Sequence, residues 1–184
     1  MYRPAQDLAL GELRAAGAQR VLDIGCGTGI FATRVRDELG VDVVGCDLSQ
    51  GMLEQARARS DRVSWVRGDS TRLPLRDGAV DGVVCTEAFH FFDQAAALAE
   101  FHRVLKPGGT LLIALINPRT ETGSRLVRVQ ALWLGAGSWP SRARMRQMVG
   151  EAGFEVRSEL RVHRVMGRLL PTVLTVARRT NRAN

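Results

Sequence analysis

The sequence has little cysteine: Cys26, Cys46 and Cys85 are its three cysteines, and no two of them form a C-x-x-C pair. Each lies inside or just after an apolar run. A disulfide framework and a metal site are therefore not expected, and a reducing cytoplasm is the expected compartment.

Long apolar runs are also lacking. No run reaches the roughly 18–20 residues that a membrane-spanning helix needs. The segment Met1-Tyr2-Arg3-Pro4 has no apolar core of the signal-peptide kind, so no signal peptide is expected. Internal repeats and low-complexity tracts are missing too, and 184 residues fit one ordinary domain, predicted to span residues 1–184.

Lysine is nearly absent, because Lys106 is the single one. The net charge of +7 is uneven: residues 1–117 carry −2 and residues 118–184 carry +9. Such a basic segment attracts an anionic substrate, a lipid surface or nucleic acid. The alternative is a general preference for arginine in this sequence, without a functional role.

Apolar runs alternate with helical patterns up to Asn117, which is typical of a parallel sheet covered by helices on both faces. The expected strands are 21–24, 41–46, 63–66, 80–85 and 111–116, and the expected helices are 29–39, 49–59 and 94–105. Ser49 is expected to cap the second helix. Lys106-Pro107-Gly108-Gly109 is predicted to be a sharp turn from helix to strand.

Beyond Asn117 the pattern predicts helices over 122–134 and from Ser141 to about Ala152. Two last strands, 154–165 and 173–177, follow. The connection between them is short and contains glycine and proline, so they are expected to form an antiparallel hairpin.

The first predicted strand ends in Asp23-Ile24-Gly25-Cys26-Gly27-Thr28-Gly29. Glycines at this spacing permit a tight turn and the close approach of a ligand, and the helix that follows favours an anionic group. The spacing is G-x-G-x-G and not the dinucleotide pattern G-x-G-x-x-G, because position 30 is Ile. Asp23 would also repel a pyrophosphate but suits an ammonium or sulfonium ion.

Two more carboxylates end the next strands. Asp47 closes the second strand and is placed to accept both hydroxyls of a ribose. Asp69, with Ser70 beside it, closes the third and is placed to accept from an exocyclic adenine amine. Taken singly, each aspartate is also compatible with a cap or a turn.

These residues resemble the successive motifs of class I S-adenosylmethionine-dependent methyltransferases. The matching segments are 21–29, Gly45-Cys46-Asp47-Leu48-Ser49, Gly68-Asp69 and Leu105-Lys106-Pro107-Gly108-Gly109-Thr110. The resemblance is closest to the small-molecule, type 11-like branch. It implies a Rossmann-like α/β fold with seven strands in the order 3-2-1-4-5-7-6, strand 7 antiparallel, and helices on both faces.

The resemblance further implies that S-adenosyl-L-methionine is the cofactor and S-adenosyl-L-homocysteine its product. Asp23, Gly25 and Gly27 are assigned to the methionine moiety, Asp47 to the ribose, and Asp69 with Ser70 to the adenine. Leu48 and Met52 would flank the adenosine, and Thr86 would lie beside the methionine end. The full expected cofactor-binding set is Asp23, Gly25, Cys26, Gly27, Thr28, Asp47, Leu48, Met52, Gly68, Asp69, Ser70 and Thr86.

Methyl transfer needs mainly orientation of donor and acceptor, and a general base only where the acceptor loses a proton. His90, a few residues after the fourth strand, is the expected base and should face the methyl-transfer region. The alternative is that His90 only packs or caps the next helix. Glu87 is a weaker candidate, and Phe89, Phe91 and Phe92 form either an acceptor wall or core.

The acceptor is expected to be a small molecule. The Asn/Asp-Pro-Pro-aromatic motif of nucleic-acid amino methyltransferases is replaced by Thr86-Glu87-Ala88-Phe89, which makes nucleic acid an unfavoured substrate. Residues 118–140 are expected to be a substrate-side insertion. Within them, 121–135 has a wide apolar face near Arg125 and Arg128, which suits a hydrophobic or lipid-like acceptor and peripheral membrane contact. An ordinary packing helix is the alternative.

Residues 1–20 are expected to form a short N-terminal cap, which either leaves the pocket open or is completed by a partner subunit, for example in a homodimer. Two other function classes remain open. One is a module that binds S-adenosylmethionine without catalysis, and the other is a nicotinamide-dependent oxidoreductase, which the glycine spacing disfavours.

Overall fold

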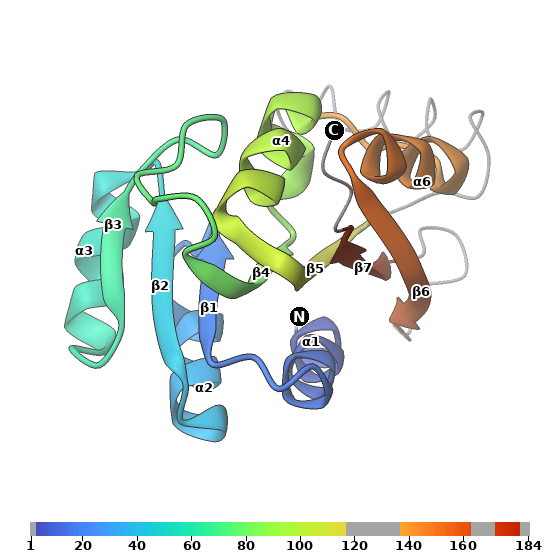
Figure 1. Cartoon of the computed structure of the whole chain (residues 1–184). Helices are drawn as coiled ribbons and strands as arrows, with labels where there is room; N and C mark the ends of the chain where they lie inside the picture. The colour runs from blue at the N-terminus through green and yellow to red at the C-terminus, as the bar shows by residue number, and fades with distance from the viewer. Residues whose placement is uncertain (1–2, 117–136, 163–171, 181–184) are drawn as a thin grey trace.

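A computed structural model of the protein describes residues 3–116, 137–162 and 172–180 (Figure 1). Its strands form one sheet of seven in the order β3-β2-β1-β4-β5-β7-β6, which confirms the expected order. The strands are β1 Arg20–Ile24, β2 Asp42–Asp47, β3 Ser64–Arg67, β4 Val80–Thr86, β5 Leu105–Ile116, β6 Phe154–Val162 and β7 Thr172–Arg179.

The sheet is parallel except at β7, which pairs antiparallel with both β5 and β6. The parallel part is β3, β2, β1, β4 and β5. Each crossover between parallel strands needs a long connection, which a helix supplies in most cases here. The carboxyl ends of β1, β2, β3 and β4 consequently share one edge of the sheet.

Helices cover both faces of the sheet, as expected. Figure 1 shows α4 and α6 on one side and α1 and α2 on the other. The helices are α1 Arg3–Ala15, α2 Ile30–Leu39, α3 Gln50–Arg59, the 3₁₀ turn η1 Phe89–Phe91, α4 Gln94–Val104 and α6 Arg142–Glu151. Side chains alternate accordingly along β4: Val83 and Cys85 join the core under α4 and α6, whereas Val84 joins the core under α1 and α2.

Side-chain caps fix where several helices begin. Ser49 accepts a hydrogen bond from Met52 N at 3.4 Å, and Ser141 accepts one from Arg144 N at 3.2 Å. Both caps were expected from the sequence. Asp93 does the same for α4, accepting from Ala96 N at 3.2 Å. These bonds satisfy backbone donors that have no partner within the helix.

At the junction between α4 and β5, the expected turn lies inside the strand. The strand begins at Leu105, directly after the helix, and Leu105 pairs with Val80 while Thr110 pairs with Gly82. Residues 106–109, opposite the single residue Asp81, are thus a break in register within β5, and the φ of +74° at Gly108, directly after Pro107, agrees with the expected sharp turn. Pro107 explains the abrupt end of α4, because proline disfavours helical backbone at the residue before it.

Several expectations fall on residues outside the described ranges. They are the helix over 122–134, the membrane-contact segment 121–135, the last residues of the strand expected over 154–165, and most of the insertion 118–140. In the part of the chain that the structure describes, no helix has the length and apolarity to cross a membrane.

Helix α1 belongs to the core and does not merely cover the site. Ala5, Ala9, Leu10 and Leu13 are buried against α2 and the sheet. Only Gln6 of this helix reaches the cavity described below. The expected cap over residues 1–20 is therefore, over its described part, a helix packed on the face of the sheet.

We expect Leu13→Ala to lower the free energy of unfolding by about 2–5 kcal/mol, because it leaves a void beside a fully buried position. Urea unfolding followed by circular dichroism measures this change. Arg14→Ala, exposed on the same helix, is the matched control and should shift stability by no more than about 0.5 kcal/mol. Equal effects of the two substitutions would contradict the packing of α1.

Candidate functional site

A cavity of about 810 Å³ lies at the carboxyl ends of β1, β2, β3 and β4. This is the edge where ligands bind in open parallel sheets. All twelve residues expected to bind the cofactor line it. They are Asp23, Gly25, Cys26, Gly27, Thr28, Asp47, Leu48, Met52, Gly68, Asp69, Ser70 and Thr86.

The turn after β1 is held against the end of β2. Gly25 N and Cys26 N both donate to the carbonyl of Cys46, at 2.9 and 3.2 Å. Gly25 has a φ of +66°, and a Cβ at that position would lie 2.4 Å from the Cβ of Ala88. Glycine is therefore required there by both backbone conformation and space.

Asp47 ties this turn to the loop after β2. Its Oδ2 accepts from Gly27 N at 2.8 Å, and its Oδ1 accepts from Ser49 N at 2.9 Å. A carboxylate has about four acceptor positions, so two remain for a ligand. The side chain is thus fixed by backbone donors while it still faces the cavity.

Asp23 is the most deeply buried ionisable carboxyl group of the site, with 1% exposure. Its Oδ2 has no hydrogen-bond partner among the described residues. Burial raises the pKa of Asp23 to about 8, against a backbone hydrogen bond at Ala32 that lowers it, and the nearby Asp47 raises it further. A buried acceptor without a partner at a cavity wall is suited to a cationic or hydrogen-bond-donating ligand.

The loop after β3 contributes Asp69, Ser70 and Thr71 to the cavity. Asp69 Oδ1 accepts from Thr71 N and Thr71 Oγ1, both at 2.8 Å. These hydrogen bonds lower the pKa of Asp69, which keeps its carboxylate charged. Sequence reasoning did not name Thr71, although its place two residues after Asp69 is typical of an Asx turn.

The cavity also has an apolar rim. Ile30, Leu48, Met52 and Phe91 are exposed by 51%, 60%, 42% and 64%, and they are the exposed large hydrophobic side chains of the described ranges. All four line the cavity. Apolar side chains gathered around one opening favour a ligand with apolar surface.

Glu87 and His90 lie differently from each other. Glu87 lines the cavity at the end of β4, and its φ of +61° is a left-handed conformation seldom adopted by this residue type. The ring of His90 stacks on Trp139, with ring centroids 4.8 Å apart, and His90 is not among the residues that line the cavity. His90 is thus not part of the described cavity wall, which agrees with the alternative that it only packs, and its role as the base stays a prediction.

Local packing explains the position of the His90 side chain. His90 lies in η1, whose neighbour Phe89 is fully buried, and Ser138 N donates to the His90 carbonyl at 2.7 Å. Burial also lowers the pKa of His90. Phe91, two residues after Phe89, is exposed at the cavity, so the aromatic cluster divides between core and site.

The remaining lining residues have weaker sequence signals. Gln6 comes from α1, distant in sequence from most of the other lining residues, and no sequence motif around it indicates a place in the cavity. Cys26 and Cys46 line the cavity as free, buried thiols. Burial raises the pKa of Cys46 to about 12 and that of Cys26 further still, so both thiols are unreactive at neutral pH.

Comparison with known proteins gives a consistent result. A family model described as a methyltransferase domain matches residues 22–113. A demethylmenaquinone methyltransferase of Beutenbergia cavernae is 42% identical over 106 residues, which cover 57% of this chain and 44% of that protein. The chain thus spans less than half the length of this relative.

Two other relatives match over a larger share of their length. A demethylmenaquinone methyltransferase of Thermus thermophilus is 34% identical over 185 residues, covering 86% of this chain and 82% of that protein. Among solved structures, a chain of the Haloferax volcanii complex that contains the Trm112 methyltransferase activator superposes with a TM-score of 0.86. It is 26% identical and covers 100% of this chain and 91% of that chain.

The pKa of Asp23 gives a testable dependence of stability on pH. Because the folded-state value of about 8 lies above the ordinary 3.8, the folded protein retains a proton that the unfolded chain releases. The retained proton on Asp23 therefore raises the free energy of unfolding, relative to the ionised form, by its full amount below about pH 4. This contribution is lost as the pH rises towards 8. We expect Asp23→Asn to remove this decline, which changes the slope of unfolding free energy by about 1.4 kcal/mol per pH unit.

Urea unfolding of the ligand-free protein at several pH values between about 5 and 7 measures this slope. Asp61→Asn, at an exposed position, is the control and should leave the slope unchanged. The same slope in Asp23→Asn as in the unsubstituted protein would show that Asp23 is ionised in the fold.

Proposed function

Because the chain belongs to the class I S-adenosylmethionine-dependent methyltransferases, we propose that it transfers a methyl group from S-adenosylmethionine to a small, apolar acceptor. The observation that carries this proposal is the gathering of the carboxylates Asp23, Asp47 and Asp69 around one cavity beside the turn at Gly25 and Gly27. This arrangement fits each part of the cofactor in turn.

The Oδ2 atom of Asp23, which has no hydrogen-bond partner among the described residues, and the turn at Gly25 and Gly27 would hold the methionine moiety. The acceptor positions left on Asp47 would hold the ribose hydroxyls, and Asp69 with Ser70 would hold the adenine. Leu48 and Met52, exposed at the rim, would flank the adenosine. The cofactor, when bound, supplies a methyl group on a sulfonium, which an acceptor nucleophile displaces.

The charge of the cavity supports a cationic cofactor over a dinucleotide. Five of the described lining residues have acidic side chains. No Lys, Arg or His is among the described lining residues. The five are Asp23, Asp47, Asp69, Glu87 and Asp93. A pyrophosphate would meet repulsion here, whereas an ammonium or sulfonium ion is attracted. This weakens the nicotinamide alternative.

The acceptor side of the proposal rests on the apolar rim. Phe91 and Phe92 line the cavity on the side of η1, and Phe91 is 64% exposed. The relatives from Beutenbergia cavernae and Thermus thermophilus are named demethylmenaquinone methyltransferases. An aromatic, quinone-like acceptor stacked near Phe91 agrees with both observations.

The chain's own contribution to the chemistry is orientation and, where the acceptor loses a proton, a base. Holding donor and acceptor in line supplies on the order of 7–11 kcal/mol of the barrier reduction in well-oriented reactions. Of the two base candidates, Glu87 lines the cavity and His90 does not. We therefore assign the proton-accepting role to the carboxylate of Glu87.

Calorimetry with S-adenosylmethionine, S-adenosylhomocysteine and NAD tests the cofactor. Incubation with S-adenosylmethionine and a panel of reduced quinones, phenols and amines then tests the transfer. Binding of the two sulfur compounds without transfer to any acceptor would favour a non-catalytic module. Failure to bind either compound would remove the proposal entirely.

We expect Asp47→Ala to weaken S-adenosylhomocysteine binding roughly 10- to 100-fold, because hydrogen bonds to a charged group are lost at the ribose and at Gly27 N. Isothermal titration calorimetry measures the dissociation constant. Asp61→Ala, exposed and outside the cavity, is the control and should bind as the unsubstituted protein does. Unchanged binding by Asp47→Ala would exclude the ribose assignment.

The two base candidates are separated by a pair of substitutions. We expect Glu87→Gln to lower turnover about 100-fold or more, the range for loss of a general base. His90→Phe keeps a ring against Trp139 and should preserve both turnover and its pH profile. Turnover with the accepted substrate, followed from about pH 6 to 9, measures both. Loss of activity in His90→Phe with intact cofactor binding would instead restore His90 as the base.

A further inference from the structure

The loop of residues 68–79 joins β3 to β4 and carries the adenine side of the proposed cofactor site. Its first residues, Gly68 to Thr71, line the cavity. Leu73 then turns into the core with 4% exposure, and the chain runs through Leu75 and Asp77 to β4. Apart from the turn at Asp69 and the bridge between Asp69 and Arg72, this loop has no helix or strand of its own, so contacts with other elements fix the rest of its conformation.

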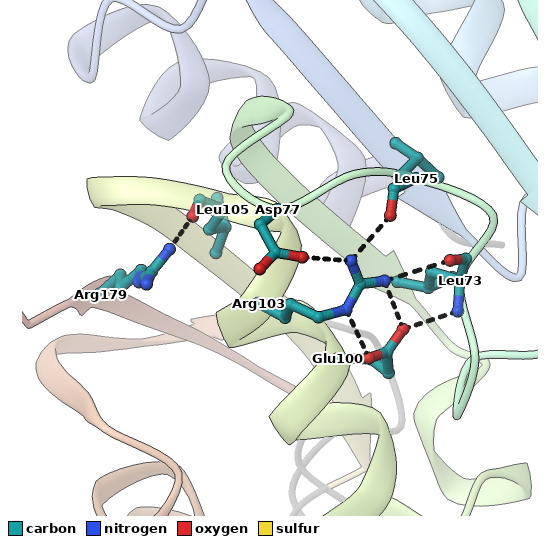
Figure 2. Close-up of polar contacts among 7 residues, drawn as sticks. All are labelled: Leu73, Leu75, Asp77, Glu100, Arg103, Leu105 and Arg179. Atoms are coloured by element: carbon teal, nitrogen blue, oxygen red, sulfur yellow. Dashed lines mark hydrogen bonds and ion pairs between the residues drawn. The ribbon is translucent and has the colours of Figure 1, made fainter. Parts of the chain in front are cut away.

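Arg103, near the end of α4, binds this loop through its whole guanidinium group (Figure 2). Nη1 donates to the Leu75 carbonyl at 2.8 Å and to Asp77 Oδ1 at 2.7 Å. Nη2 donates to the Leu73 carbonyl at 3.1 Å and to Glu100 Oε2 at 2.7 Å, and Nε donates to Glu100 Oε1 at 2.7 Å. An arginine has five N–H donors, and all of them are used here.

Glu100 completes the contact from the same helix. Its Oε2 accepts from Leu73 N at 2.7 Å, so both the N–H and the carbonyl of Leu73 are held by α4. The paired guanidinium of Arg103 lowers the pKa of Glu100 and keeps this acceptor charged. In addition, Gly78 N donates to the backbone carbonyl of Arg103 at 3.0 Å.

The held segment contacts the cavity wall directly. A Cβ on Gly68 would lie 2.7 Å from Cδ of Pro74, so Pro74, between the two held carbonyls, packs on Gly68. On the other side, Arg72 N donates to the Asp69 carbonyl at 3.1 Å, one residue before Leu73. The position of Leu73 to Leu75 is therefore transmitted to Gly68 and Asp69 by contact and by hydrogen bonds.

We propose that Arg103 and Glu100 are positioning residues for recognition of the adenine: they fix the loop that presents Asp69 and Ser70 to the cofactor. This rests on the proposed function, since it takes the adenine to lie at Asp69. The ion pair is bidentate and extends to Asp77, so it also contributes to stability, and the ligand comparison below separates that contribution from positioning.

The test compares two ligands that differ only at the base. S-adenosylhomocysteine carries an exocyclic amine that Asp69 can accept from, and S-inosylhomocysteine carries a carbonyl in its place. We expect Arg103→Gln to weaken S-adenosylhomocysteine binding roughly 3- to 10-fold, the value of one hydrogen bond, and to leave S-inosylhomocysteine binding nearly unchanged. The ratio between the dissociation constants of the two ligands, which measures discrimination, therefore falls.

Three further variants sharpen the result. Arg103→Lys keeps the charge but has three donors and no fork, so it should not restore the discrimination. Asp69→Asn combined with Arg103→Gln should show less loss than the sum of the two single changes, because both act on one contact. Arg76→Gln removes the same charge from an exposed position on the same loop and should bind both ligands normally.

Each outcome decides the inference. An Arg103→Gln protein with native circular dichroism and unchanged discrimination overturns it, and so does an equal loss for both ligands, which indicates a general structural role. If Arg103→Gln does not fold, Glu100→Gln is tested in its place, and a smaller loss of discrimination is expected. Unchanged discrimination in Glu100→Gln would then overturn the inference. An unsubstituted protein that binds neither ligand would instead refute the proposed function.

Discussion

The hydrogen bond from Gly27 N to Asp47 holds the site together, because it joins the turn after β1 to the end of β2. Parallel pairing brings these two strand ends to one edge, but it does not fix the loops that leave them. Asp47 does so by accepting from both loops at once. Together with the Cys46 carbonyl, which accepts from Gly25 N and Cys26 N, this carboxylate fixes the glycine turn.

The electrostatics of the cavity follow from that geometry. Asp23 lies close enough to Asp47 for the second carboxylate to raise its pKa, in addition to the larger effect of burial. Collecting carboxylates in one cavity is unfavourable without a counter-charge. The proposed sulfonium cofactor would supply this charge, and in the ligand-free protein the raised pKa of Asp23 reduces the repulsion.

Local patterns predicted the strands and the carboxylates that follow them, whereas the sheet order and the roles of Leu48, Met52 and Thr86 were predicted through the resemblance to the methyltransferase motifs. The structure confirms the sheet order. Apolar runs identify strands, and glycines and aspartates at strand ends fall on one edge of a parallel sheet. The sequence left open whether His90 serves as a base or only packs, since the direction of a side chain in a short 3₁₀ turn depends on which neighbour is buried. Phe89 takes the core position, and Trp139, distant in sequence, covers the imidazole.

By itself, therefore, the sequence determined the order of elements, the G-x-G-x-G turn and the carboxylates at the ends of β1, β2 and the loop after β3. Periodicity and turn chemistry act over a few residues and are visible in one dimension. Only the tertiary structure decided that Glu87 and not His90 faces the cavity, and that Arg103 holds the loop of Asp69. These outcomes depend on contacts between segments some 30 to 50 residues apart, whose geometry no local pattern specifies.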